Sequence, residues 1–283
     1  MGGNSDEETA LLAIAPLVLF VFQLVPLPSS APPAAPAPVR VSVDPRVELI
    51  SIVFRLAGNP EYNQGRVPAY VKAVDEHFAP FKDHAVVRRA RSLREKKGIG
   101  FDAPMKLAVY LDGIDTLRIR PARSGFALTE DGDSRWTPDD AEAFLVDLRA
   151  FVKEARVAAF LEAQRTLFEA ARASLEQATS GAGLPEWLQA FFGTEAPEAD
   201  LIACVGLLNG GSNYGASARP AGGRNESYSI LGTPADADGR PDYPPATLAT
   251  AAHEFVHSYA NRLVDANMDR LRATGEKLFA AVR

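Results

Sequence analysis

The sequence predicts an α+β domain that is mainly helical, with a small β-sheet beside a helix at about residues 245–264. Three observations lead to this fold class. Apolar residues recur at helical spacing over much of the chain between residues 47 and 192. Short apolar runs with β-branched residues occur between residues 201 and 231, where they predict strands. A helical pattern resumes at about residue 245, and this last helix contains the segment HEFVH.

The composition is that of an ordinary folded protein. Of the 283 residues, 47% are hydrophobic and 23% are charged, which excludes disorder over most of the chain. The formal net charge of -6 argues against a nucleic-acid partner, because proteins that bind nucleic acids usually present a basic surface. Cys204 is the single cysteine, so any metal must be bound by histidine and carboxylate rather than by several thiolates.

Residues 1–27 are predicted to be a signal peptide or an N-terminal membrane anchor. Residues 11–25 are apolar except for Gln23, and this length suits the core of a secretory signal better than a full membrane span. A buried helix of the folded domain is the alternative. Residues 28–38 are rich in proline and alanine and predict an extended linker. We therefore expect a domain at residues 39–283 that lies outside the cytoplasm, secreted or anchored to the membrane.

Each helix is predicted from its apolar spacing and from the residues at its ends. Gly58 and Gly98 are placed to end two helices, and Asp102 and Thr137 are placed to cap the start of two others. The pattern that begins at Thr137 is long for one globular helix, so a break or a helical hairpin is an alternative there. The predicted helices are residues 47–57, 68–78, 83–97, 102–111, 137–179, 185–192 and 245–264.

The predicted strands lie directly before the last helix. Residues 201–208 are a short apolar run that predicts a buried strand, and residues 226–231 alternate as in a half-exposed strand. Between them, residues 209–215 (NGGSNYG) predict a glycine-rich turn. Cys204 lies in the first run, so we expect a packed and unreactive thiol.

The segment HEFVH, at residues 253–257, carries the predicted chemistry. Residues four positions apart lie on one face of a helix, so His253 and His257 can share one metal ion, and zinc suits two imidazoles. Glu254 lies about 100° around the helix from His253, beside the ion without being forced to bind it. There it is expected to deprotonate a metal-bound water and to pass the proton to a leaving amine. The alternative is a helix whose two histidines have no metal role.

This segment resembles the HExxH motif of the zincin metallopeptidases. The resemblance implies that His253 and His257 bind zinc and that Glu254 is the general base and acid. Ala260 and Leu263 stand where the metzincin branch has glycine and histidine, so this chain departs from that branch.

The third zinc ligand is assigned only by resemblance. The gluzincin branch uses a downstream glutamate, and Glu276 stands at a spacing that some gluzincins use, after a predicted turn at residues 274–275. Residues 44–63, LNGGSNYG and HEFVHSYANRL are also similar to an exported bacterial family catalogued as a domain of unknown function. The chain continues further in that family, so a residue beyond Arg283 is an alternative ligand. An ordinary acidic residue in the first turn of a helix is the remaining interpretation of Glu276.

Several other side chains are weaker candidates. Asn261 follows His257 by four residues on the same helical face and is a candidate to orient its ring. His77 and His84 are expected to be surface or capping residues. The candidate donors to an oxyanion are Tyr214, Tyr228, Tyr243 and Tyr259.

The sequence therefore predicts zinc-dependent hydrolysis of peptide bonds outside the cytoplasm, with a peptide or protein as substrate. One alternative is a non-catalytic, membrane-anchored binding module that retains a zincin-like fold. A second alternative is a metal-assisted hydrolase that acts on substrates other than peptides. The third ligand distinguishes the catalytic interpretation from the binding module, because two histidines alone do not complete a catalytic zinc site.

Overall fold

A computed structural model describes residues 37–123, 125–126, 128, 135–181, 183–193 and 199–281. The predicted signal or anchor and nearly all of the predicted linker lie outside these residues. In the part of the chain that is described, no helix is both long and apolar enough to cross a membrane. The described elements confirm a mainly helical α+β fold with a small mixed sheet.

The sheet has four strands in the order β1-β2-β4-β3. Strands β1 (Arg40–Ser42), β2 (Ala199–Gly206) and β4 (Asn225–Gly232) are parallel, and β3 (Tyr214–Ala218) is an antiparallel edge strand. The two predicted strands are confirmed as β2 and β4, but β4 is buried from Ser227 to Gly232 and is not half-exposed as predicted, because helices cover both faces of the sheet. Strands β1 and β3 were not predicted, and β3 includes Tyr214 and Gly215, which had been assigned to the glycine-rich turn.

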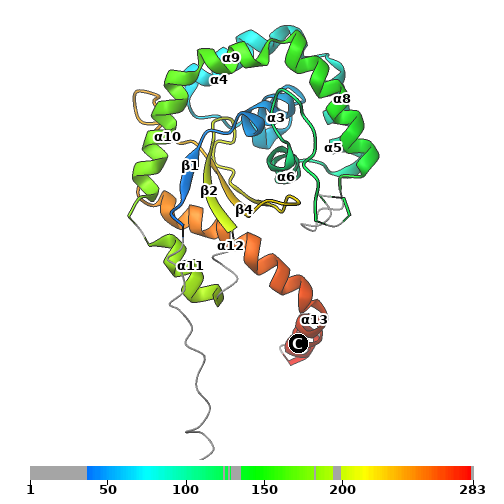
Figure 1. Cartoon of the computed structure of the whole chain (residues 1–283), viewed down its shortest axis with the longest axis vertical. Helices are drawn as coiled ribbons and strands as arrows, with labels where there is room; N and C mark the ends of the chain where they lie inside the picture. Colours follow the sequence, from blue (N-terminus) through cyan, green and yellow to red (C-terminus); the bar gives the residue numbers. More distant parts are fainter. Residues whose placement is uncertain are drawn as a thin grey trace, which may run out of the picture. The chain divides into compact units, whose positions relative to one another are not determined.

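Helices cover both faces of this sheet (Figure 1). Successive residues of a strand point to opposite faces. On β4, the Tyr228 hydroxyl accepts a hydrogen bond from Arg46 on one face, whereas Ser227 on the other face is 2.8 Å from Ser258. The first face is therefore covered by α3 (Pro45–Leu56) and α6 (Ala103–Tyr110). The second is covered by α10 (Arg165–Thr179) and α12 (Thr247–Ala266).

The central helix α3 is buried over most of its length, from Val47 to Phe54. Asp44 caps its start by accepting a hydrogen bond from the Arg46 N–H, and Pro45 lies in its first turn, where a missing N–H has no cost. Gly58 follows its end with a φ of 85°, as the sequence predicts for a helix stop.

The remaining helices lie around this core, except for the last one, which extends away from it (Figure 1). They are α4 (Pro68–Phe78), α5 (Ala85–Lys97), α8 (Pro138–Glu154), α9 (Val157–Ala163), α11 (Leu184–Phe192) and α13 (Met268–Ala281), with short 3-10 turns at Pro60–Tyr62 and Ala79–Phe81. His84 caps α5 through its Nδ1 atom, which accepts from the Val86 N–H, so its expected capping role is confirmed. The side chain of Asp102 does not cap α6 as predicted, because it pairs with Arg135 and Lys106 instead.

The stretch predicted as one helix at residues 137–179 is three helices, α8, α9 and α10. The first break is at Arg156, whose φ of 50° is left-handed, and the second is at Gln164. Thr137 begins the series as predicted, since its hydroxyl accepts from the Asp140 N–H. The breaks allow Val157 and Phe160 to turn into the core.

A fully buried carboxyl lies between the central helix and the loop after β2. The Tyr70 hydroxyl donates to Glu48 Oε2 at 2.6 Å, and the Leu207 N–H donates to Glu48 Oε1 at 3.1 Å. Burial raises the pKa of Glu48 to about 7, although these two hydrogen bonds favour its charged form.

We predict that Glu48→Gln removes a pH-dependent loss of stability. The folded pKa lies above the unfolded value, so the stabilising contribution is complete below about pH 4.5 and is lost as the pH rises to about 7. The shift corresponds to a change of about 3 kcal/mol in the free energy of unfolding. Urea unfolding at pH 4.5 and pH 8 should show the variant gaining about that amount relative to wild type at the higher pH. An equal difference at both pH values would contradict the prediction.

Candidate functional site

Helix α12 places its two histidines on a face directed away from the core. Ala251 and Phe255 are fully buried, and a residue two positions further along a helix lies about 200° around it. His253 is accordingly exposed and His257 is half-buried. Their ring centroids are 4.8 Å apart and their planes are at 88°.

This geometry fits two imidazoles that bind one zinc ion. With zinc–nitrogen bonds of about 2.0–2.1 Å and a tetrahedral angle, the two ring centres would be about 5 Å apart. The observed separation of 4.8 Å agrees with that value. Two of the sequence-predicted ligands, His253 and His257, are therefore brought together.

Asn261 lies one turn beyond His257, as its spacing predicts. The His257 Nδ1 atom is 3.3 Å from Asn261 Oδ1. If the Nδ1–H donates this hydrogen bond, the Nε2 lone pair is left available for a metal ion. Asn261 is thus placed to select the tautomer that a metal ligand needs.

Glu254 lies on the sheet side of the histidine pair and is buried, with 7% of its surface exposed. Burial raises the pKa of the Glu254 carboxyl, while His257, His253 and the Gly215 backbone N–H favour its ionised form. The carboxyl is therefore held next to both imidazoles.

The edge strand β3 packs directly on this turn of α12. A Cβ atom at Gly215 would overlap the Glu254 carbonyl oxygen and would lie 3.0 Å from His257 Cβ. Glycine at this position therefore allows the strand to approach the helix. Gly215 was predicted to lie in a turn, so its contact with α12 was not predicted. The contact depends on the pairing of β3 with β4, which makes Gly215 part of the sheet edge.

Glu276 is not brought to the histidine pair. It is exposed on α13, which continues without interruption through Thr274 and Gly275, so the predicted turn there is wrong. Among the residues that the structure describes, no group of three His, Cys, Asp or Glu side chains could hold a metal ion. The ligand role of Glu276 remains a prediction.

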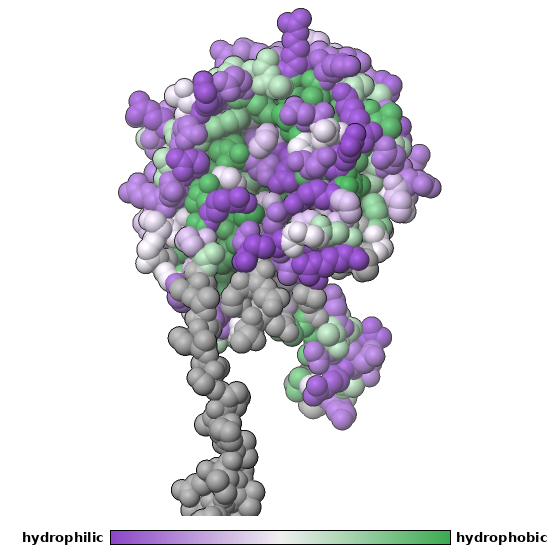
Figure 2. All heavy atoms as spheres, viewed as in Figure 1, coloured by the Kyte–Doolittle hydropathy of each residue, from purple (hydrophilic) through white to green (hydrophobic). Residues whose placement is uncertain are grey.

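Exposed apolar residues follow the histidine pair along α12 and α13. Val264 follows His257 by seven residues on α12, and Leu271 and Leu278 are seven residues apart on one side of α13. Their exposed fractions are 43%, 49% and 64%. Figure 2 shows hydrophobic and hydrophilic residues together on the surface of α13. These three side chains are thus uncovered in the part of the chain that the structure describes.

The four candidate tyrosines have other surroundings. Tyr214 packs against Tyr62, with ring centroids 6.2 Å apart, on the face of the sheet opposite α12. The Tyr243 hydroxyl is 2.8 Å from the Thr233 hydroxyl, and Tyr259 stacks on Phe192. The structure therefore provides no support for any of them as a donor at Glu254. His77 is exposed, as expected of a surface residue, although its Nε2 is 2.8 Å from the Ala155 carbonyl oxygen and its ring lies against Phe160.

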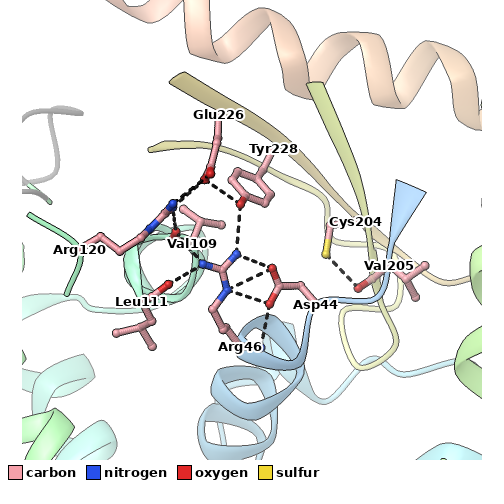
Figure 3. Close-up of polar contacts among 9 residues, drawn as sticks. All are labelled: Asp44, Arg46, Val109, Leu111, Arg120, Cys204, Val205, Glu226 and Tyr228. Atoms are coloured by element: carbon pink, nitrogen blue, oxygen red, sulfur yellow. Dashed lines mark hydrogen bonds and ion pairs between the residues drawn. The ribbon is translucent and has the colours of Figure 1, made fainter. Parts of the chain in front are cut away.

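A polar network lies between the sheet and the helices α3 and α6 (Figure 3). The Arg46 guanidinium pairs with Asp44, and Arg120 makes two hydrogen bonds of 2.6 and 2.9 Å to Glu226. Burial disfavours the charged form of Glu226, but Arg120 holds the pKa of that carboxyl below its ordinary value. The Tyr228 hydroxyl joins the two pairs, since it accepts from Arg46 and donates to Glu226. These charges satisfy one another, so we assign the network a structural role.

A cavity of about 570 Å³ lies between β4 and α12, on the face of the sheet that α12 covers. Ser258, Tyr259 and Leu263 line it from α12, and these residues lie on a different side of the helix from the histidine pair. The cavity is therefore separate from the candidate metal site.

Cys204 lies in neither site. It is fully buried, and burial raises the pKa of its thiol, as expected for an unreactive cysteine.

The family described as a domain of unknown function (DUF4932) matches residues 39–278. No curated protein and no solved structure matches the chain.

Proposed function

We propose that this chain, which belongs to the family described as a domain of unknown function (DUF4932), is a zinc-dependent peptidase that acts outside the cytoplasm. The observation that carries the proposal is the pairing of His253 and His257 at 4.8 Å with a buried Glu254 on the same turn of helix. The extracytoplasmic location rests on the apolar N-terminal segment of the sequence.

His253 and His257 would hold the metal ion. Zinc at this position would supply a Lewis acid and a water molecule of lowered pKa. Asn261 would orient the His257 ring, and such partners commonly change metal affinity by about 10- to 100-fold when they are removed.

Glu254 would carry the proton transfers. Its carboxylate accepts a proton from the attacking water and then donates it to the nitrogen of the leaving amine. Burial and the Gly215 N–H hold the carboxyl in one position beside the two imidazoles. This fixed position supports a role as general base and acid rather than as a third ligand.

A peptide is the substrate that the edge strand favours. Within the described residues, no strand pairs with the outer edge of β3, and Gly215 of that strand lies against Glu254. An extended peptide can add to such an edge through main-chain hydrogen bonds. Because these hydrogen bonds involve only the main chain, a peptide of any sequence could place a peptide bond close to Glu254.

The third ligand separates this proposal from a non-catalytic binding module. For Glu276 to bind the same ion as the histidines, α13 has to change direction relative to α12 at Asn267, the residue between them. The absence of a third ligand group among the described residues favours the binding module as the second candidate. A module of that kind would bind peptides at the β3 edge without cleaving them.

Hydrolysis of a mixed peptide panel by the purified full chain tests the proposal. We expect cleavage that a chelator abolishes and added zinc restores, because the metal supplies the Lewis acid. His84→Ala serves as a control for the loss of a histidine outside the site, and it should retain cleavage. His84 caps α5, which is far along the chain from α12. Peptides that bind but remain intact would support the binding module, and cleavage that is indifferent to chelation would contradict the zinc site.

A further inference from the structure

Arg66 is an exposed cation held against a glycine loop near the candidate site. A Cβ atom at Gly211 would lie 3.2 Å from Arg66 Nη2, so the guanidinium rests on a backbone that has no side chain. Among the described residues, no acidic group pairs with Arg66. A guanidinium with free donors is suited to a carboxylate, which it can bind through two parallel hydrogen bonds.

The loop below Arg66 leads into the edge strand. Residues 207–213 connect β2 to β3, and Asn213 Oδ1 fixes this loop to β4 by accepting from the Gly232 N–H at 3.0 Å. Gly210 has a φ of 59°, and a Cβ atom there would overlap the Gln64 carbonyl oxygen. The segment that carries Arg66 therefore packs closely on the loop, which holds the arginine beyond the first residue of β3.

The direction of β3 determines which end of a peptide would meet Arg66. Gly215 packs on Glu254, whereas Ser217, two residues later on β3, lines the same cavity as Ser258, four residues later on α12. The two elements therefore run in the same direction. A peptide that pairs antiparallel with the free edge of β3 would have its C-terminal end toward Tyr214 and Arg66. Antiparallel pairing is the more stable arrangement for an added strand.

The distance between Gly211, which contacts Arg66, and Gly215, which contacts Glu254, corresponds to a few residues of an extended peptide. Gly211 precedes Gly215 by four residues, which span at most about 14 Å at the rise of an extended strand. A terminal carboxylate two or three residues beyond the bond at Glu254 would therefore come within reach of Arg66.

We propose that Arg66 binds the C-terminal carboxylate of the substrate, so that the protein releases a dipeptide or tripeptide from the C-terminus. This inference rests on the proposed peptidase function. In the reaction the C–N bond breaks, the hydroxyl of water bonds to the carbonyl carbon, and Glu254 passes the one remaining proton of that water to the nitrogen of the leaving amine. The released product keeps the original carboxylate, which stays paired with Arg66 until it dissociates.

The test compares peptides that differ only at the C-terminus. An equimolar mixture of N-dansylated hexapeptides is prepared with free carboxylates and, separately, as C-terminal amides. Hydrolysis is measured with wild type, Arg66→Gln and the control Arg165→Gln, a change at an exposed arginine on α10. Binding is measured by fluorescence anisotropy with the same arginine variants in a Glu254→Gln chain, which gives a readout that does not depend on turnover.

We expect wild type and Arg165→Gln to prefer the free acids by about 10- to 100-fold, and Arg66→Gln to lose this preference, because a charged hydrogen-bonded pair is removed. Equal hydrolysis and binding of acids and amides by wild type would overturn the role of Arg66 and leave the peptidase intact. An acid preference in binding without hydrolysis of either mixture would support the carboxylate site and reject the peptidase. An unchanged preference in Arg66→Gln would overturn the assignment to this residue.

Discussion

Replacement of Glu254 by glutamine is expected to lower peptide turnover by about 10²- to 10⁴-fold, the usual contribution of general acid–base catalysis. Glutamine has nearly the same shape but cannot accept a proton from water at neutral pH. The side chain is buried beside Gly215 and the two imidazoles, so its place in the fold should be retained. Steady-state hydrolysis of the peptide panel measures the effect.

The matched control for this change is Glu162→Gln. Glu162 is an exposed glutamate on α9 that pairs with Arg165, so its replacement alters a surface charge without touching α12. Turnover of this control should equal that of wild type. Full turnover in Glu254→Gln would reject the proton-transfer role of Glu254.

A second large effect is expected from Gly215→Val. The new side chain would overlap the Glu254 carbonyl oxygen and crowd His257, so β3 must move away from α12. Misplacement of a catalytic group by about 1 Å costs on the order of 10²-fold in rate, and overpacking of this kind costs about 1–3 kcal/mol in the free energy of unfolding. Turnover and urea unfolding are measured together, so that a loss of activity in a folded protein can be recognised.

Gly113→Val provides the comparison for this glycine. A Cβ atom at Gly113 meets nothing within 4 Å, so the same change of residue type there should leave turnover unaltered. If Gly215→Val retained the turnover of wild type, the close contact between the edge strand and the catalytic turn would have no functional meaning.

The helices were largely predictable because their signals are local. Thr137 and Gly58 act at the ends of their helices as their residue types predict, and the HEFVH segment lies within α12. The breaks at Arg156 and Gln164 were not placed, because neither residue is a helix breaker by itself. The left-handed conformation of Arg156 is imposed by packing of the following segment, in which Val157 is fully buried.

The unpredicted strands and the polar network depend on contacts between distant segments. β3 reads YGASA, which has little intrinsic strand preference, and it becomes a strand by pairing with β4. Arg120 and Glu226 are separated by 106 positions in the chain, so no local pattern indicates their pairing.

In the candidate site, too, the local features were predictable and the features that depend on distant contacts were not. The spacing of His253 and His257 was sufficient to place both rings on one helical face, with Glu254 beside them. The position of Glu276 depends on how α13 is directed after Asn267, and this direction is a tertiary property. Gly215 was missed because a glycine in a short polar segment predicts a turn, whereas here it permits close packing.

In the proposed metal site, His253 and His257 share one zinc ion beside a carboxylate that does not bind it. Elemental analysis of zinc in wild type, His253→Ala and Glu254→Gln is the measurement that decides whether this site exists. About one zinc ion per chain is expected in wild type and in Glu254→Gln, and none in His253→Ala, because one imidazole cannot retain the ion. An equal zinc content in wild type and His253→Ala would contradict it.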